Sequence, residues 1–453
     1  MKKTTILSLA AAFCAAVLHA GTPAPKQTAA IQPQPDVNPL SFFDGRLVLD
    51  FEERVRFESR NNNFDFNQKV KTVNDSSWLL QRARLGVKFA ATDWLTFYVQ
   101  GQSAFEFGNA RPKVPGALGA EGDNPIDLYQ AWIRLGDKNF NATIGRQLLS
   151  YGDERLVGAF DWNNLGRSFD GVKVHYGTDT WNIEAFTSSV VVQKRDVFDQ
   201  SDLFDGNDTG RGQIFSGLYF SSTGLIPVQT TDFYAFELHE DYKTGDTDFV
   251  TLGTRMKGDP KKLGGFDYET EMAVQTGKVK GKDLGAFAGH WGAGYNWTGN
   301  SWKPRIGLEY NYATGDGNAA DGKVGTFQNL FPTNHPFYGT ADFFSWQDIH
   351  NPAVSFSVQP TDKIKVKLDY HLFWLADTHD AWYRANGVTQ VRSINPKADG
   401  FVGSELDLNA MWKATKNVSV GAGYSHFFSG KYAKATGAAS DADFVYAQLS
   451  IKF

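Results

Sequence analysis

The amino-acid sequence predicts an all-β protein: a transmembrane, antiparallel, up-and-down β-barrel of the outer-membrane type with about 18 strands. The first observation is a repeated alternation of apolar and polar residues over segments of roughly 10–14 residues, a length that crosses a bilayer at a tilt. The second is that short and long connections alternate between these segments. The third is composition: of 453 residues, 14% are aromatic, 21% are charged and 45 are glycine. This mixture is typical of a β-rich chain whose apolar residues are distributed in alternation.

Residues 1–20 are predicted to be a secretory signal peptide. Lys2 and Lys3 form its positive region, an apolar run follows, and the segment ends at Ala20, the small residue that a cleavage site needs. The single cysteine of the chain, Cys14, lies inside this segment. The exported chain is therefore expected to form no disulfide and to use no thiolate. Removal of the segment leaves 43 basic and 50 acidic residues, a net charge of −7.

Residues 21–43 are predicted to form a periplasmic tether, because five prolines fall between Pro23 and Pro39 and favour an extended chain. Residues 44–453 are predicted to form the barrel. Its first strand is clear from one apolar face, made of Leu47, Leu49, Phe51, Val55 and Phe57, and one charged face, made of Asp50, Glu52, Arg54, Arg56 and Glu58. The same pattern recurs along the chain, for example over 82–89, 287–297 and 364–374. The last strand alternates from Val445 to the terminal residue, Phe453.

The connections between predicted strands fall into two length classes. Short turns are predicted at 92–93, 136–139, 177–180, 298–301, 360–363 and 414–417, and longer segments at 59–76, 108–125, 150–167, 191–211, 315–348, 376–401 and 430–442. Outer-membrane barrels have short periplasmic turns and long external loops. The sheet is expected to close on itself, because every backbone polar group must be paired inside lipid. No internal apolar run approaches the ~20 residues of a membrane-spanning helix, which excludes a helical membrane protein.

The charged faces of the predicted strands are expected to line the lumen, since the apolar faces contact lipid. Arg54 and Arg56 belong to one strand and Arg82 and Arg84 to its neighbour, so four guanidinium groups are predicted to share one wall. The other basic lumen candidates are Lys88, Arg134, Lys173, Arg255, Arg305, Lys365 and Lys367. A barrel of this size leaves an aqueous channel, and rings of such charges select anions. The alternative for any single charge is a solvated residue or a structural ion pair.

Residues 145–171 carry the most specific pattern in the chain. They contain Gly-Arg-Gln at 145–147, Tyr-Gly-Asp-Glu-Arg-Leu-Val-Gly at 151–158, Asp-Trp at 161–162 and Gly-Arg-Ser-Phe-Asp-Gly at 166–171. This order resembles the signature of the alginate export family of outer-membrane β-barrels. Leu-Tyr-Gln-Ala-Trp at 128–132 and Glu-Leu-Asp at 405–407 add to the resemblance.

The resemblance implies an 18-stranded porin-like barrel whose positively charged lumen passes an acidic polysaccharide. It also implies a folded, ion-paired external loop that leans into the pore. By residue type, this loop would use Arg146, Asp153, Glu154, Arg155, Asp161, Arg167 and Asp170. The alternative for each of these residues is a loop contact that never meets solute.

Three functions are compatible with the sequence. The first is passive diffusion of anionic oligosaccharide or polysaccharide (alginate-like) or other anionic solutes through an arginine-containing lumen. The second is a general diffusion porin with modest charge selectivity. The third is an outer-membrane enzyme or adhesin with a blocked lumen. Against an enzyme, the chain has no Gly-x-Ser-x-Gly elbow and no His-Glu-x-x-His site. We therefore predict no catalytic residue, cofactor or metal ligand.

The sequence also predicts the surroundings of the protein. The signal peptide and barrel pattern indicate the bacterial outer membrane, with its lipid and lipopolysaccharide as contacts. The terminal Phe453 on an alternating strand resembles the signal read by the β-barrel assembly machinery. A pI near 6.0 argues against nucleic acid as a partner. The acidic stretches 199–208 and 316–321 could hold Ca²⁺, but they lack EF-hand spacing, and solvated loops are the favoured interpretation.

Overall fold

The computed structural model describes residues 40–108, 110–116, 120–195, 198–202, 212–241, 245–387 and 393–453. The predicted signal peptide, 1–20, and residues 21–39 of the predicted tether lie outside the described residues. Within the described ranges, no helix is long and apolar enough to cross a membrane.

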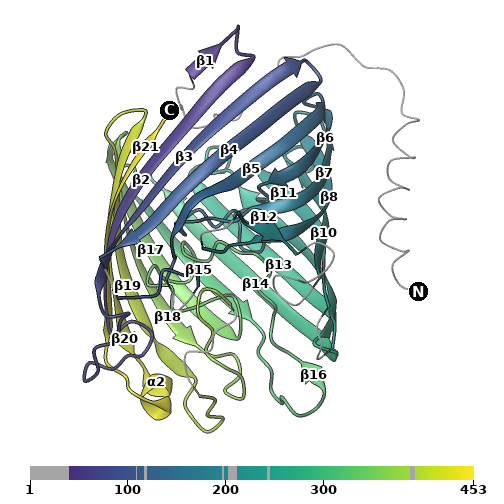
Figure 1. The fold of residues 1–453 in the computed structure, drawn as a ribbon. Helices are drawn as coiled ribbons and strands as arrows, with labels where there is room; N and C mark the ends of the chain where they lie inside the picture. Colours follow the sequence, from purple (N-terminus) through teal and green to yellow (C-terminus); the bar gives the residue numbers. More distant parts are fainter. Residues whose placement is uncertain are drawn as a thin grey trace.

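The described chain forms one closed antiparallel barrel of 18 strands (Figure 1), which confirms the predicted fold. The wall consists of β2 (Leu47–Asn61), β3 (Ser77–Thr92), β4 (Leu95–Phe107), β5 (Asn124–Gly136), β6 (Phe140–Gln147), β7 (Phe169–Gly177), β8 (Trp181–Val192), β10 (Gln213–Ser222), β11 (Gln229–Glu240), β12 (Thr247–Gly258), β13 (Phe266–Val279), β14 (Lys282–Asn296), β15 (Arg305–Ala313), β17 (Ile349–Thr361), β18 (Ile364–Trp374), β19 (Phe401–Lys413), β20 (Val418–Ser429) and β21 (Ala442–Lys452). Each wall strand pairs with the next along the chain. The first and last, β2 and β21, pair from Glu52↔Lys452 to Asn61↔Asp443 and close the ring.

Four short elements lie outside the wall order. Strand β1 (Leu40–Phe42) pairs with the start of β2, so the end of the predicted tether continues the sheet. Strand β9 (Gln200–Ser201) pairs with β8, and β16 (Lys323–Val324) lies parallel to the start of β14. The helix α2 (Lys431–Thr436) follows β20.

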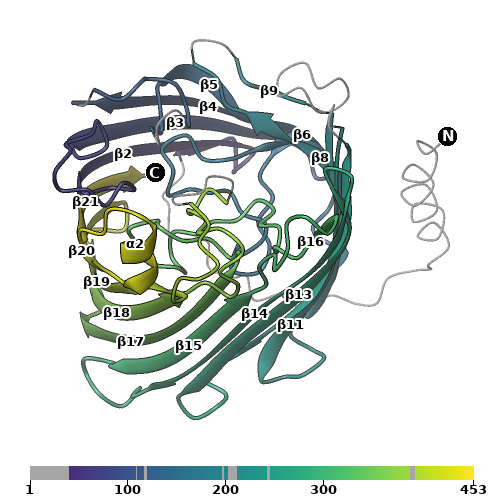
Figure 2. The ribbon, with the colours of Figure 1, turned by 90° about the horizontal axis from the view of Figure 1, so that it is seen from below.

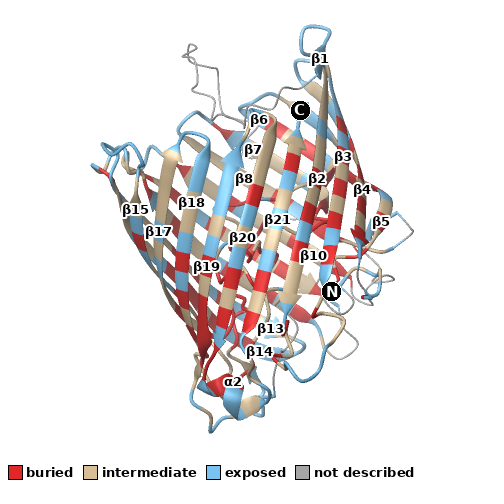
Figure 3. Cartoon of the chain, turned by 90° about the vertical axis from the view of Figure 1, so that its left-hand side faces the viewer, coloured by how far each residue is buried: buried red, intermediate tan, exposed pale blue. Residues whose placement is uncertain are grey.

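Alternation along the strands separates a lipid-facing surface from the interior, as predicted. On β3, Leu85 is 57% exposed on the outer face, whereas Arg82 and Arg84 are 0% and 5% exposed inside. Figure 3 shows this change of burial along neighbouring strands of the wall. A one-residue slip of register would exchange the two faces, so the pattern fixes the pairing.

The two ends of the barrel differ as the connection lengths predict. The turn end carries the short turns, β1 and the C-terminus, and the loop end carries the long segments (Figure 1). The hairpin between β13 and β14 is an exception, because it turns at the loop end with two residues. These are Lys280 at φ 50° and Gly281 at φ 80°, the positive values that a tight hairpin turn requires.

Much of the loop end is filled by its own long segments, which fold into the mouth of the barrel (Figure 2). Their buried aromatic residues pack on the inner wall. Phe344 stacks on Phe373 of β18 at 3.8 Å between ring centroids, and Trp382, which is fully buried, lies 6.0 Å from Phe427 of β20. Narrowing of the lumen therefore comes from the loop end, where the sequence predicted it.

A candidate channel crossed by one loop

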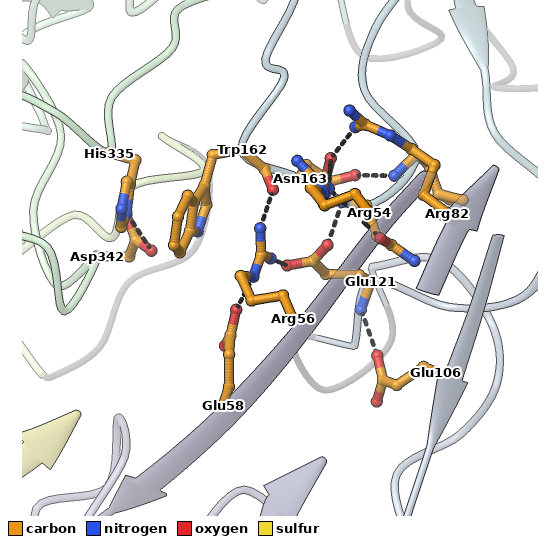
Figure 4. Close-up of polar contacts among 12 residues, drawn as sticks. Arg54, Arg56, Glu58, Arg82, Glu106, Glu121, Trp162, Asn163, His335 and Asp342 are labelled. Carbon is orange, nitrogen blue, oxygen red and sulfur yellow. Dashed lines mark hydrogen bonds and ion pairs between the residues drawn. The ribbon is translucent and has the colours of Figure 1, made fainter. Parts of the chain in front are cut away.

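The segment between β6 and β7, residues 148–168, is called the crossing loop here. One part of it binds the inner wall of β2 and β3 (Figure 4). Asp161 Oδ1 accepts hydrogen bonds from Arg82 Nη2 and Arg84 Nη1, each at 2.9 Å. Arg54 donates to the backbone carbonyls of Asp161 and Asn163, at 2.5 and 3.0 Å. Three arginines thus hold one turn of the crossing loop.

Arg56 holds the next residue of the loop. Its guanidinium donates to the Trp162 carbonyl at 2.5 Å and lies 3.9 Å from the centre of the Trp162 ring. It also pairs with Glu58 at 2.7 Å and with Glu121 at 2.8 Å. The other side of the loop tryptophan meets His335, whose ring stacks at 3.7 Å. A charge with this many partners is suited to fixing a backbone position.

The four arginines predicted to share one wall do lie on neighbouring strands and point inward. Arg54, Arg56, Arg82 and Arg84 are only 4%, 0%, 0% and 5% exposed, however, because the crossing loop lies between them and the lumen. The structure therefore brings these four residues together as anchors of a loop, and water does not reach them as a free basic surface.

The other part of the crossing loop binds the far side of the barrel. Asp153 accepts from Arg255 and Lys257 of β12, each at 2.5 Å. Arg155 contacts His290 of β14 at 3.2 Å and Glu309 of β15 at 3.5 Å. These strands stand opposite β2 and β3 in the ring (Figure 2). The crossing loop therefore spans the interior from wall to wall.

A second loop, residues 314–348, supports the crossing loop. Glu154 accepts from Thr333 Oγ1 at 2.6 Å. Arg167 donates to the carbonyls of Phe331 and Pro332, at 2.6 and 3.0 Å. Burial lowers the pKa of Arg167 to about 10. Of the predicted site residues, Glu154 thus binds a hydroxyl of the second loop and Arg167 binds its backbone.

Burial and neighbouring charges shift the pKa values of the two aspartates that bind the walls, Asp153 and Asp161, in opposite directions. Burial raises the pKa of Asp161, but the guanidinium groups of Arg82 and Arg84 outweigh it and hold that pKa well below the ordinary value of an aspartate. At the other end, burial and the neighbouring Glu269 raise the pKa of Asp153 above its ordinary value. As pH falls, Asp153 is therefore protonated before Asp161, and the contact of the crossing loop with β12 weakens first.

Arg146 lies away from the lumen, although the sequence placed it among the pore residues. It shares the face of β6 with Ile144, which is 46% exposed on the outer surface. Its guanidinium forms two bonds to Asp170 of β7, at 2.8 and 3.0 Å, and a third to the Asp199 carbonyl at 2.8 Å. The resemblance implied that Arg146 and Asp170 belong to an ion-paired external loop, whereas both lie on wall strands and pair on the outer face, because the side of the sheet depends on strand register.

The remaining predicted cations line the turn half of the interior in two groups. The first group contains Arg134 and Lys173, which flank Thr143 in one lateral row, and Lys88 on the nearby β3. The second contains Arg305 and Lys367, which flank Ser357 in one row, and Lys365 beside them on β18.

Half of these six cations have carboxylate partners. Lys173 pairs with Glu184 at 3.3 Å, Arg305 with Asp267 at 2.7 Å and Lys367 with Asp369 at 2.9 Å. In the part of the chain that the structure describes, the other three, Lys88, Arg134 and Lys365, have no carboxylate within ion-pair distance, and all three are exposed. Arg134 donates one hydrogen bond to Thr143 Oγ1 at 3.2 Å, and all three side chains lack a carboxylate partner that would compete with an anionic solute.

Sequence reasoning missed several residues that shape this channel. Glu121 pairs with Arg56 from a loop that showed no motif, and Lys257 binds Asp153 from the turn half of β12. Trp162 belongs to the quoted Asp-Trp pair, but nothing in the sequence marks its ring as the surface for an arginine. Only the fold brings these residues together.

Of the two acidic stretches considered for Ca²⁺, the structure describes 316–321 in full. Within those ranges, no three His, Cys, Asp or Glu residues are grouped so that they could hold an ion. In the stretch 316–321, Asp316 and Asp321 accept backbone N–H groups of Asn318 and Lys323, at 3.1 and 2.8 Å. Most of the other acidic stretch, at 203–208, lies outside the described residues.

Comparison with known proteins gives both a family and a fold. A family model described as alginate export matches residues 46–447. None of the curated proteins matches the sequence. Among solved structures from Pseudomonas aeruginosa, OccD3 (OpdP) is 14% identical, with 95% of this chain and 99% of that chain covered and a TM-score of 0.59.

Two further Pseudomonas aeruginosa structures are similar to the same extent. OccK9 (OpdG) is 12% identical, with 90% of this chain and 98% of that chain covered and a TM-score of 0.61. The outer membrane protein OpdK is 11% identical, with 89% and 98% covered and a TM-score of 0.57. At these identities the likeness shows a shared barrel fold.

Proposed function

Because the chain belongs to the alginate export family of outer-membrane channels, we propose that its solutes are anions that carry carboxylate groups. Acidic oligosaccharides or polysaccharides and smaller carboxylates would cross by passive diffusion down their own gradient. The observation that carries this proposal is the pair of cation groups in the turn half of the lumen, in which Lys88, Arg134 and Lys365 have no carboxylate partner among the described residues.

The arrangement of these cations suits a moving anion. A solute that leaves Arg134 remains near Lys173 in the same row, and one at Lys365 remains near Lys367. Each contact is expected to stay weak, because a barrel of this size leaves an aqueous channel and Glu184, Asp267 and Asp369 offset part of the charge. Conduction needs binding that favours entry and still permits release.

A small carboxylate has a precedent in the same fold. One of the similar Pseudomonas aeruginosa structures is OpdK with vanillate, an aromatic acid. The alternative function is a general diffusion porin with modest selectivity, which is favoured by the three ion-paired cations and by a net charge of −7 for the predicted exported chain.

Planar bilayer recordings test the proposal. In a KCl gradient, the zero-current potential of the wild type should indicate anion preference, and K365Q/K367Q should move it toward cation preference. The matched control is K69Q/K71Q, which removes the same charge from exposed positions of the loop after β2. Soluble oligoglucuronate should reduce the KCl current of the wild type more than that of K365Q/K367Q.

The outcomes separate the three functions. Equal potentials for wild type and K365Q/K367Q, with normal conductance, would favour the general porin. A protein that is folded but conducts no ions would point to a blocked lumen. Either result would remove the proposed preference for carboxylates.

A further inference from the structure

The outer surface of β2, β3 and β4 contains a polar patch in the middle of its apolar face. The outward residues of β2 run Leu47, Leu49, Phe51, Glu53, Val55 and Phe57, so a glutamate interrupts an otherwise apolar stripe. We call Glu53, Gln81, Ala83, Gly101 and Ser103 the wall patch. All five belong to the face that carries the exposed Leu85 and Val99, away from the lumen.

Strand register places these five residues side by side. Glu53 pairs with Ala83, which pairs with Ser103, so these three form one lateral row. Gln81 lies one step along β3 on the same face, and its Nε2 donates to Glu53 Oε1 at 2.8 Å. Gly101 lies one step along β4 in the opposite direction.

Large apolar side chains surround the wall patch. Phe57 is 41% exposed, Leu79 38%, Leu85 57% and Val99 51%. A lipid-facing barrel strand normally keeps charged groups out of this zone, because ionisable residues are expensive in hydrocarbon and are usually paired there. Gln81 supplies one hydrogen bond, while a carboxylate can accept about four.

Three residues of the wall patch, Ala83, Gly101 and Ser103, are small. A Cβ atom added to Gly101 would meet nothing nearer than the Asp127 carbonyl at 3.9 Å, and its φ is not in the positive range. Neither backbone conformation nor packing within the chain therefore requires glycine at this position. Inside membranes, small residues at a surface allow two proteins to approach closely.

We propose that a second copy of this chain docks on the wall patch, with the β2–β4 walls of the two copies face to face about a two-fold axis. An isologous contact needs a surface that complements itself. The wall patch contains both an acceptor and donors: the ionised Glu53 carboxylate only accepts hydrogen bonds, whereas Gln81 and Ser103 can donate them. Each copy would place these donors opposite the partner's carboxylate.

The contact would bury the polar atoms of Glu53, Gln81 and Ser103 away from lipid and would cover the small residues beside them. The acyl chains of lipids cannot satisfy the Glu53 carboxylate, because they have no hydrogen-bond donor. The two lumens would stay separate and parallel, since the wall patch faces away from both. The proposal is therefore independent of which solute the channel passes.

Cross-linking in isolated outer membranes tests the proposal. The only natural cysteine is Cys14 in the predicted signal peptide, so S103C supplies a single thiol to the exported chain. Oxidation with copper phenanthroline, or a short bis-maleimide, should convert S103C to a species of twice the chain mass. The control is L308C on β15, which is 67% exposed on the outer surface and far from the patch, and it should remain monomeric.

A second pair of variants tests the polar contact itself. E53L/Q81L in the S103C background should lose the dimer band while its unheated gel band still migrates as a folded barrel. If S103C does not insert, A83C takes its place in the same row. A dimer that persists in E53L/Q81L would overturn the role of the polar pair.

Other outcomes would overturn the second-copy proposal. S103C could stay monomeric while a lipid-soluble maleimide labels it, which would mean that lipid covers the wall patch. An adduct whose mass differs from twice the chain mass would identify an unlike partner. Equal yields for S103C and L308C would indicate random collision.

Discussion

Asp153 of the crossing loop lies 2.5 Å from Arg255 of β12, on the opposite side of the barrel from the wall where Arg82 and Arg84 hold Asp161 of the same loop. Each carboxylate binds two cations, and the two sites are separated by only eight positions of sequence. A short segment is thus fixed at two walls by charge, and its position in the lumen follows from these contacts.

Asp161→Asn should weaken one of the two wall contacts of the crossing loop, while the bonds from Arg54 and Arg56 to the backbone carbonyls remain. Loss of hydrogen bonds to charged groups costs about 1.5–3 kcal/mol each, so amide exchange in residues 159–165 should rise and the current noise should increase. In the wild type this anchor should persist at pH 5, because a lowered folded pKa loses its stabilisation only as pH falls through that pKa. D321N, in an exposed loop, is the control, and equal exchange in both variants would contradict the prediction.

Arg82→Ser should reduce stability more than it changes selectivity. The variant removes the fully buried guanidinium of Arg82, which pairs with Glu52 and Asp161. Removing one member of a buried ion pair costs about 3–5 kcal/mol. The temperature at which the folded gel band disappears should fall, while the zero-current potential should move less than in K365Q/K367Q. A large change of potential without loss of stability would show that Arg82 faces the solute.

Selectivity should weaken with salt. The screening length is about 30 Å at 0.01 M ionic strength and about 3 Å at 1 M, and the free cations lie in a wet lumen. Permeability ratios measured at fixed gradient ratio and rising total KCl should therefore converge toward that of bulk solution. The variant R134S should start closer to that limit. A ratio independent of salt would indicate a dry contact that excludes ions by size.

Asp348 should make the loop end less stable as pH rises. It is 1% exposed, its Oδ1 accepts from the Asp377 amide at 2.7 Å and its Oδ2 has no partner among the described residues. Burial and the nearby Asp380 raise its pKa. A raised folded pKa contributes stability that is present below the ordinary value and lost as pH rises through the folded value.

Asp348→Asn should remove this pH dependence, because the amide oxygen can still accept the bond from Asp377 and carries no charge. Amide exchange in residues 314–326 and 375–381, corrected for the intrinsic effect of pH, reports the outcome. Wild type should lose protection as pH rises through the raised pKa of Asp348, and D348N should not. Identical pH profiles would show that Asp348 stays ionised in the folded loop.

Deletion of Phe453 should lower insertion into the outer membrane. Phe453 exchanges two backbone hydrogen bonds with Phe51, at 3.0 and 3.2 Å, and its ring is 41% exposed at the turn end. The residue predicted to act as the assembly signal is thus partly exposed at the turn end. F453Y should insert normally, and export across the inner membrane should be unchanged in both. Equal insertion of the deletion variant and wild type would refute the signal.

The barrel could be predicted from the sequence because its rule is local. On β3 the alternation of Leu85 and Val87 with Arg84 and Lys88 states which side faces lipid, and nothing distant is needed to interpret it. Connection lengths are equally local. The same rule fails where a strand departs from it, as at Glu53, a carboxylate on an otherwise apolar face.

The channel could be predicted only in part, because its shape depends on distant contacts. Asp161 and Arg82 are 79 positions apart, and no spacing in the sequence links them. The quoted motif identified the residues of the crossing loop and their tendency to form ion pairs. It could not state that the loop covers Arg54, Arg56, Arg82 and Arg84, or that Arg146 lies on the outer face.

The crossing loop also has a mechanical consequence. An empty cylinder of strands can be squeezed into an oval with little change in its hydrogen bonds. Here one diameter is braced, because flattening the barrel along it must stretch or compress a segment fixed by Asp153 at one wall and by Asp161 at the other. Under lateral pressure in a crowded membrane, the barrel should therefore deform less along the diameter that the crossing loop spans than along the diameter at right angles to it.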